Sequence, residues 1–344
     1  MDPSFHDTFL ASAQTASDTV RRLGGNASLG AWMGETGGCY NSGHYNMSNA
    51  FMDAFWYLES LAGFARNGAT AFCRQTLLGG NYELVDKDTL SPNPDFYAAA
   101  LFSKLMGTNV LDAAAAVVSD YQGERVRGGD DGGGERLDGG DQEPLLLRAW
   151  AHCSKVTTDD GTAGDSSTSS GGSSSTSSSS TSSTTAVAPG SVTVLLLNYG
   201  NDTALASIGG ASTAPSSSPP AVGAAAAAAA KAEAAASSDP SSDSRAPPRA
   251  GEEGLLFGQL YLVTGGDDGE DRLHSRTVKL NGVTLVLGSS SGGGGSDDPD
   301  AIPALEPRRL PLLPDEVSVA LPPHSYAFVV VPPEAFSSGA AACF

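Results

Sequence analysis

A glutamate stands where a short apolar run of the sequence gives way to a glycine-rich segment. The run Leu29-Gly-Ala-Trp-Met-Gly leads directly into Glu35, and Thr-Gly-Gly-Cys-Tyr-Asn-Ser-Gly follows. In α/β barrels the catalytic side chains lie at the carboxyl ends of strands, so this position suits a catalytic carboxylate. A solvated glutamate at the end of a strand is the other interpretation. Hydrolysis of a glycosidic bond also requires a second carboxyl group on the opposite side of the bond.

Charge and composition exclude several other kinds of chemistry. Lys and Arg number 19 against 39 Asp and Glu, so no basic patch can displace counterions from nucleic-acid phosphates. No apolar run is long enough to span a membrane. His44, His152 and His324 stand outside any carboxylate or serine constellation, so we interpret them as structural. The four cysteines lack metal-ligand spacing, and we expect no metal and no cofactor.

The elements that position Glu35 follow from hydrophobic periodicity. Helices are predicted over 6–23, 48–65 and 95–106, with extended runs before Glu35 and over 70–75. This alternation is typical of a parallel α/β sheet or barrel. Two strands and three helices are too few for a closed eight-stranded barrel. Either a partner supplies the rest, or the chain is a C-terminal piece of a longer protein.

From residue 145 the pattern changes to strands. Asn281-Gly282 suits a type I′ turn and predicts a hairpin over 277–287. Since the closure entropy of a loop grows slowly with its length, long insertions between strands are tolerable. We therefore predict two domains, an incomplete TIM barrel over 1–112 and one β-sandwich with expanded loops over 113–344. The candidate strands are 145–153, 191–197, 255–263, 277–287, 317–321 and 325–331.

Four stretches contain almost no large apolar residues: 122–143, 157–190, 209–254 and 288–300. They cannot bury enough surface to offset the entropy of ordering, so we expect them to be disordered. Together they carry more than half of the net charge of −20.

Several short motifs, in the same order and at matching spacing, resemble plant-type heparanase-like proteins of glycoside hydrolase family 79. The resemblance covers about 1–112 densely and the later strands more thinly, with the Ser, Gly and Ala insertions outside it. The motifs are Trp32-Met-Gly-Glu-Thr-Gly-Gly, Tyr40-Asn-Ser-Gly, Ser48-Asn-Ala-Phe, Phe55-Trp-Tyr-Leu, Cys73-Arg-Gln, Gly79-Gly-Asn-Tyr, Pro92-Asn-Pro-Asp-Phe-Tyr, Leu105-Met-Gly, Ala151-His-Cys-Ser-Lys and Leu280-Asn-Gly.

The resemblance implies a retaining β-glucuronidase in which a (β/α)8 barrel is followed by a β-sandwich. By this match Glu35 is the nucleophile at the end of the seventh barrel strand, and it forms a glycosyl ester with the anomeric carbon. The family's general acid/base is a glutamate that follows an asparagine near the end of the fourth strand. The chain contains no Asn-Glu pair, so we expect it to be inactive alone.

The same match implies the residues around the sugar. Tyr40, Asn41 and Ser42 border the sugar subsites, and Gln75 is a polar group near the nucleophile. Gly80, Asn81 and Tyr82 match the loop that binds the glucuronate carboxylate. Without the resemblance, Gly79-Gly80 is an ordinary turn and Tyr82 a packed aromatic residue. Arg74 is expected to pair structurally on the opposite side of its strand, Cys73 to be a buried thiol, and the role of Cys39 stays open.

The resemblance also implies a disulfide bond between Cys153 and Cys343 and maturation outside the cytosol, in an extracellular or a lysosome- or vacuole-like compartment. Sequons occur at Asn26, Asn46 and Asn201, although such a short pattern also arises by chance. The first residues have neither a basic segment nor an apolar core, so no signal peptide is visible.

We therefore expect part of a glycosidase that acts on glucuronic-acid-bearing glycans. The acidic charge favours glucuronides on neutral or weakly acidic glycans over long sulfated polyanions. The alternative is a non-catalytic secreted protein that binds glycans or belongs to the cell wall. Sequence does not determine the oligomeric state.

Overall fold

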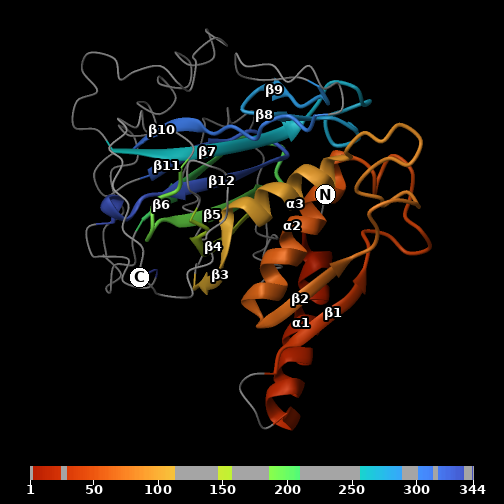
Figure 1. Ribbon diagram of the computed structural model, residues 1–344, viewed down its shortest axis with the longest axis horizontal. Helices are drawn as coiled ribbons and strands as arrows, with labels where there is room; N and C mark the ends of the chain where they lie inside the picture. The colour runs from red at the N-terminus through yellow and green to blue at the C-terminus, as the bar shows by residue number, and fades with distance from the viewer. Residues whose placement is uncertain are drawn as a thin grey trace, which may run out of the picture.

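The computed structural model describes residues 3–24, 29–112, 146–156, 186–209, 256–288, 301–312, 317–336 and 343. Asn26 lies outside these residues, as do nearly all residues of the four stretches expected to be disordered. Figure 1 shows helices and a short parallel sheet beside a large antiparallel sheet. No helix in the described part of the chain has the length and apolar character needed to cross a bilayer.

Helices and strands alternate in the first part of the chain, as the hydrophobic pattern predicts. β1 and β2 pair in parallel, because the helix between them returns the chain to the same end of the sheet. The observed bounds differ from the predicted ranges by a few residues at most. The elements are α1 Ser4–Gly24, β1 Ala31–Thr36, α2 Phe51–Arg66, β2 Ala69–Arg74 and α3 Pro94–Leu105.

A glycine lets α1 approach α2 closely. A Cβ atom on Gly63 would lie only 2.3 Å from Leu10 Cδ2, so a larger residue there would require the Leu10 side chain to move. Beside this contact the Phe9 ring packs on Phe64, with centroids 5.0 Å apart.

Eight strands form an antiparallel sheet, seven of them in the order β3-β4-β5-β12-β7-β8-β9. The eighth, β10, pairs with residues 256–260 of β7, whereas β8 pairs with residues 263–265 of the same strand. Strands β6 Ala204–Ile208 and β11 Val317–Leu321 form a small second sheet. Apolar side chains of β11 pack against β5 and β12, so the two sheets face each other across a buried layer. The strands of the large sheet are β3 Met106–Leu111, β4 Leu147–Ser154, β5 Val192–Asn198, β7 Leu256–Gly265, β8 Val278–Leu280, β9 Val283–Thr284, β10 Arg308–Leu312 and β12 Ser325–Val331.

The predicted hairpin is confirmed. Asn281 and Gly282 have φ values of 51° and 86°, as a type I′ turn requires, and they join β8 to β9. Asn281 also donates its side-chain amide to Leu260 O and Glu306 O, which ties the turn to the neighbouring strand and to the segment before β10.

Strands β3, β6 and β10 were not predicted, and each has a reason. β3 contains Gly107 and Asn109, which are poor strand formers. β10 contains Pro311, which is tolerated because the strand lies at an edge of the sheet. β6 is short and rich in Ala and Ser. β3 pairs with β4, so the large sheet begins before residue 112, where the sequence suggests a domain boundary.

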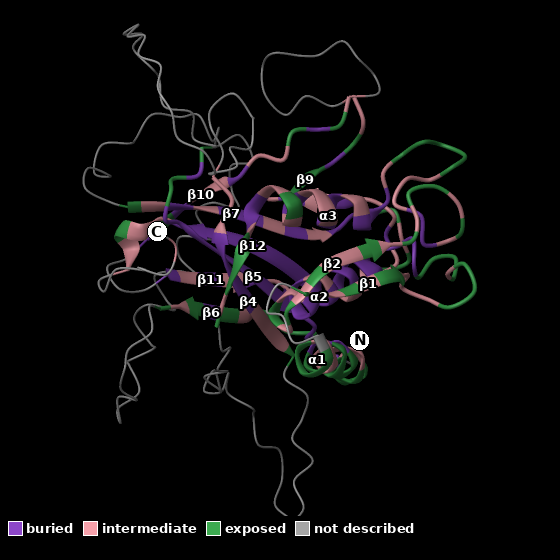
Figure 2. Cartoon of the chain, turned by 60° about the horizontal axis from the view of Figure 1, so that its bottom comes forward, coloured by how far each residue is buried: buried purple, intermediate pink, exposed green. Residues whose placement is uncertain are grey.

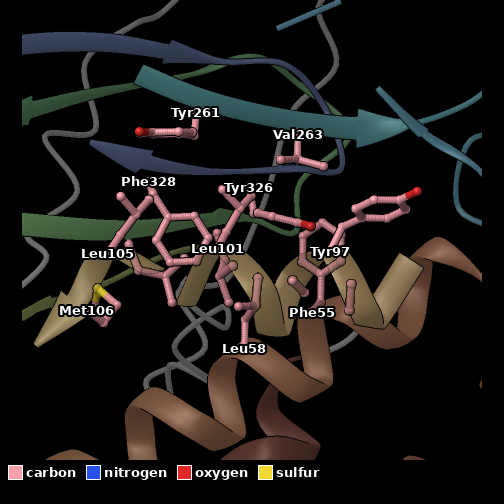
Figure 3. Close-up of a cluster of buried hydrophobic side chains, with 14 of the residues drawn as sticks. Phe55, Leu58, Tyr97, Leu101, Leu105, Met106, Tyr261, Val263, Tyr326 and Phe328 are labelled. Atoms are coloured by element: carbon pink, nitrogen blue, oxygen red, sulfur yellow. The ribbon is translucent and has the colours of Figure 1, made fainter. Parts of the chain in front are cut away.

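One apolar core joins the helices to the large sheet (Figure 3). α2 contacts the large sheet through Phe55 and Tyr326, whose rings are 6.0 Å apart, and it contacts β2 through Phe64 and Phe72. In Figure 2 the buried residues run along the large sheet, α2 and α3, whereas α1 has a broad exposed face. The labelled core residues are Phe55, Leu58, Tyr97, Leu101, Leu105, Met106, Tyr261, Val263, Tyr326 and Phe328.

Cys153, in β4, forms a disulfide bond with Cys343, with a Cα–Cα distance of 5.4 Å. The bond closes a loop across 190 positions and fixes the C-terminal end of the chain to the large sheet.

A buried histidine in β4 gives stability a defined pH dependence. His152 is 3% exposed, its Nδ1 lies 2.7 Å from Gly107 O, and its Nε2 has no partner among the described residues. Burial lowers the pKa of His152, whereas the Gly107 carbonyl acts in the opposite sense. Between the lowered pKa of folded His152 and its pKa in the unfolded chain, the unfolded chain therefore binds a proton at this group and the folded protein does not. Stability from this group is present above the unfolded pKa, about 6.5, and is lost as pH falls below it.

We expect wild type to lose stability relative to His152→Asn between pH 7 and pH 5, by up to about 1.4 kcal/mol per pH unit. The asparagine amide can still donate to Gly107 O. Urea midpoints of both proteins across this range test the difference, and parallel pH profiles would contradict it. His44→Asn, at an exposed position, is the matched control.

Candidate active site

The two parallel strands bring Glu35 and Gln75 to the same edge of the short sheet. Thr36 is aligned with Arg74 in the strand register, and Gln75 N donates to Thr36 O at 2.7 Å. The Glu35 side chain is exposed, and among the described residues no hydrogen bond or ion pair holds it. Its carboxylate is accessible from solvent at the carboxyl end of β1.

The loop that follows Glu35 is held in a tight conformation. Asn41, Ser42 and Gly43 have φ values of 57°, 69° and 82°, so three successive residues occupy the left-handed region. A Cβ atom on Gly43 would lie 2.4 Å from Ser48 Oγ and 2.8 Å from Tyr82 N, which explains the glycine. Such a conformation costs energy for non-glycine residues and persists only where neighbours enforce it.

The loop that follows β2 supplies those neighbours. Asn81 N donates to Ser42 O at 2.6 Å, and the Ser48 hydroxyl donates to Asn81 O at 3.1 Å. The Tyr82 ring is buried, and a Cβ atom on Gly37 would lie 3.0 Å from it. The structure therefore brings Ser42, Gly80, Asn81 and Tyr82 together. Both loops extend from the same side of the molecule in Figure 1.

Tyr40 is not part of these contacts. It lies in the same loop, but its side chain is 98% exposed. Gln75 is also exposed, so its amide is presented to solvent beside Thr36.

Arg74 pairs structurally, as its alternation predicts, whereas the prediction of a buried Cys73 is wrong. The Arg74 side chain is 3% exposed and forms ion pairs with Asp53 and Asp95. Cys73 points to the other face of β2 and is exposed, because nothing in the described part of the chain covers that face of the two-stranded sheet.

Sequence analysis missed three buried acids around the site. Asp53 and Asp95 lie in the first turns of α2 and α3, and they are 7% and 2% exposed. Glu83 is 6% exposed and accepts hydrogen bonds from the backbone amides of Gly79 and Lys87. By helical spacing Asp53 lies away from the apolar face that contains Phe55 and Leu58, so hydrophobic periodicity contained no signal for its burial. For Glu83 the signal was a carboxylate four residues after a glycine.

The electrostatics of the two aspartates follow from burial. Burial, and next the neighbouring Asp95 carboxyl, raises the pKa of Asp53 well above its usual range, although Arg74 acts in the opposite sense. Burial also raises the pKa of Asp95. Cys39, half-buried in the loop after Glu35, has a raised pKa because of burial and the nearby Asp53.

The large sheet also supports the site loops, through the connection between β7 and β8. Phe51 N and Met52 N, at the start of α2, donate to Ser275 O and Leu273 O. Arg276 donates to Asp86 at 2.6 Å and to Asn93 at 3.0 Å, and the ion pair contributes to a lowered pKa of Asp86.

The remaining candidate residues are surface features. Asn46, in the loop after Glu35, and Asn201, after β5, are exposed, as acceptors of glycans must be. Within the described residues, no three His, Cys, Asp or Glu side chains gather where they could hold a metal ion.

Comparison with known proteins identifies similar sequences. Residues 1–62 match the Glycosyl hydrolase family 79, N-terminal domain. The chain is 39% identical over 155 residues to heparanase-like protein 1 of Arabidopsis thaliana, covering 45% of this chain and 23% of that protein. It is 52% identical over 81 residues to the baicalin-beta-D-glucuronidase of Scutellaria baicalensis, covering 24% of this chain and 15% of that protein.

A GH30 endoxylanase from Clostridium papyrosolvens C71 is a structural neighbour with a TM-score of 0.39 and 8% identity, over 93% of this chain and 46% of that one.

The family match and the relatives thus make the chain similar to glycoside hydrolases. Within that class the similarity is to the plant-type heparanase-like proteins of family 79. The chain spans less than a quarter of the length of these curated relatives.

Proposed function

We propose that this chain is the C-terminal part of a retaining β-glucuronidase in which Glu35 is the nucleophile. The observation that carries the proposal is the position of Glu35. Its exposed carboxylate lies at the carboxyl end of a parallel strand, directly before a loop that is locked to the loop after the next strand. One relative is named a glucuronidase, and this supports the choice of sugar.

In this mechanism a Glu35 oxygen attacks the anomeric carbon while the bond from that carbon to the glycosidic oxygen breaks. The departing oxygen takes the electron pair and a proton from an acid on the opposite side of the sugar. Water then hydrolyses the glycosyl ester, so the configuration of the sugar is retained. The two carboxyl groups must be about 5–5.5 Å apart.

The site residues receive their roles from the two interlocked loops. Gly80, Asn81 and Tyr82 form the loop that binds the glucuronate carboxylate, through backbone amides and the Tyr82 hydroxyl. The Asn81 amide itself donates to Ser42 O and holds the loop in place. Gln75 lies beside the nucleophile. Tyr40, Asn41 and Ser42 border the neighbouring subsites. The exposed Tyr40 ring suits stacking on a sugar, because an aromatic face accepts the apolar face of a pyranose.

The acid/base belongs to further strands that complete a (β/α)8 barrel around β1 and β2. Each of these strands has one unpaired edge in the described sheet, and Trp32 on β1 is 74% exposed. Exposed edges and large apolar side chains mark surfaces that another element covers. In this proposal the barrel ends with α3, and the β-sandwich domain begins with β3.

The substrate is a glucuronide carried on a neutral or weakly acidic glycan, since the chain is acidic even outside the four stretches and offers no basic patch to a long sulfated polyanion. The disulfide bond and the exposed sequons at Asn46 and Asn201 suit an extracellular or lysosome-like compartment.

Azide rescue of a nucleophile variant tests the assignment in a longer protein that contains this chain and the missing strands. We expect Glu35→Gly to lower turnover of 4-nitrophenyl β-D-glucuronide by at least about 10⁴-fold. Sodium azide should restore turnover and yield the α-glucuronyl azide, because azide attacks from the vacated face. Glu35→Gln, whose amide occupies that space, is the control and should show no rescue. Full activity of Glu35→Gly, or a β-azide product, would overturn the proposal.

A further inference from the structure

One arginine contacts the loop after β2 directly, and it contacts two aspartates at the starts of α2 and α3. Arg74 Nη2 donates to Tyr82 O at 3.1 Å, in the loop after β2, and to Asp53 Oδ2 at 3.2 Å. It also donates to Asp95 Oδ2 at 2.5 Å. The guanidinium is centred 5.0 Å from the Trp56 ring and 4.9 Å from the Tyr57 ring, so its orientation is fixed by stacking as well as by hydrogen bonds.

Asp53 connects this arginine to the loop that follows Glu35. A Cβ atom on Gly38 would lie 2.0 Å from Asp53 Oδ1, so the backbone of the loop passes directly over the Asp53 carboxyl. A larger residue at position 38 would collide with this buried carboxyl. The position of Asp53 therefore limits the path of the backbone three residues from Glu35.

The two carboxyls of the cluster depend on one cation. Both are buried beside the Arg74 guanidinium, and burial raises the pKa of each, although Arg74 acts in the opposite sense. Because breaking a buried ion pair is strongly destabilising, Arg74 fixes the positions of both carboxyls as well as contacting the Tyr82 carbonyl.

We propose that Arg74, together with Asp53 and Asp95, is a positioning residue that sets the loop after Glu35 and the loop containing Tyr82 relative to each other. The inference rests on the proposed function only in that the two loops are taken to line the active site. The arrangement of the loops themselves can be tested without any substrate.

Cys39 provides a reporter of the loop position. It is half-buried one residue after Gly38, whereas the other free cysteine, Cys73, is exposed on the far side of β2. In a full chain carrying Cys73→Ser, alkylation of Cys39 by iodoacetamide measures how well the loop stays in place. Rates are taken from pH 7 to 10, so that changes in the thiolate fraction are separated from changes in access.

We expect Arg74→Met to raise the pH-independent alkylation rate of Cys39 by about tenfold or more, because methionine cannot hold Asp53 and Tyr82 O. Arg74→Lys should give an intermediate rate, since an ammonium lacks the planar fork and the stacking. With Arg74 intact, Asp53→Asn should keep most of the protection of Cys39, because the asparagine amide can still accept from Arg74. Arg66→Met, at an exposed ion pair with Asp112, is the matched control.

The dependence on urea separates positioning from general stability. A displaced loop exposes Cys39 through a local change, so the rate should not depend on low urea concentrations. Global unfolding would make the rate rise steeply with urea. An unchanged rate in Arg74→Met, or a rise seen only in parallel with global unfolding, would overturn the proposal. If Arg74→Met does not fold, Arg74→Lys decides by the same criterion. Failure of this test leaves the azide result unaffected, and the converse also holds.

Discussion

Purified residues 1–344 are expected to release no measurable 4-nitrophenol from 4-nitrophenyl β-D-glucuronide. The candidate nucleophile has no second carboxyl group to work with in the described residues. Asp53 and Asp95 are buried against Arg74, and Glu83 is bound to the backbone amides of its own loop. A missing general acid alone costs about 10²–10⁴ in rate.

The assay is deliberately generous, because 4-nitrophenol is a good leaving group that needs little protonation. Absence of turnover would therefore reflect the missing barrel strands as well as the missing acid. The chain and its Glu35→Gln variant should give the same background rate. Turnover by the chain that Glu35→Gln abolishes would contradict the expectation and show that residues 1–344 form a complete site.

The largest stability effect is expected at Glu59, a buried acid in α2. Its side chain is 1% exposed and accepts hydrogen bonds from Arg148 and Tyr199, and His6 Nδ1 lies 2.5 Å away. Arg148 also binds Asp7 at 2.7 Å. Removing Arg148 leaves a buried carboxylate without its cation, so Arg148→Leu should lower the free energy of unfolding by about 3–5 kcal/mol.

A double variant identifies the cause of that loss. In Arg148→Leu with Glu59→Gln the unpaired charge is gone, so much of the stability should return in urea unfolding. Arg66→Leu breaks an ion pair whose side chains are 48% and 94% exposed, and it should cost at most about 1 kcal/mol. If Arg148→Leu and Arg66→Leu have equal effects, Glu59 does not depend on its cation.

Local patterns predicted the parts of the fold that local physics decides. Helical periodicity located α1, α2 and α3, and Asn281-Gly282 identified a hairpin from two residues alone. β3, β6 and β10 escaped because their stability comes from neighbouring strands rather than from their own composition. The predicted burial of Cys73 was wrong for a related reason, because the sequence of an apolar strand does not show whether both faces of the strand are covered.

The candidate site shows the same division. The sequence predicted that Glu35 follows an apolar strand and that the Arg74 side chain points to the opposite side of its strand from Cys73 and Gln75. The lock between Ser42 and Asn81, and the passage of Gly38 over Asp53, join residues far apart in sequence. No periodicity encodes such contacts, so they required the three-dimensional structure.

The place of β12 in the large sheet has a consequence for biosynthesis. This strand lies between β5 and β7, and its Tyr326 stacks on Phe51 at the start of α2. Chains emerge from the ribosome with the N-terminal end first. The helices that carry the site loops are thus made early but lack a central strand of their supporting sheet until β12 has been translated. The site can therefore be completed only after β12 has emerged, and a nonsense mutation shortly before β12 would remove the support of the site while leaving Glu35 and both site loops in the product.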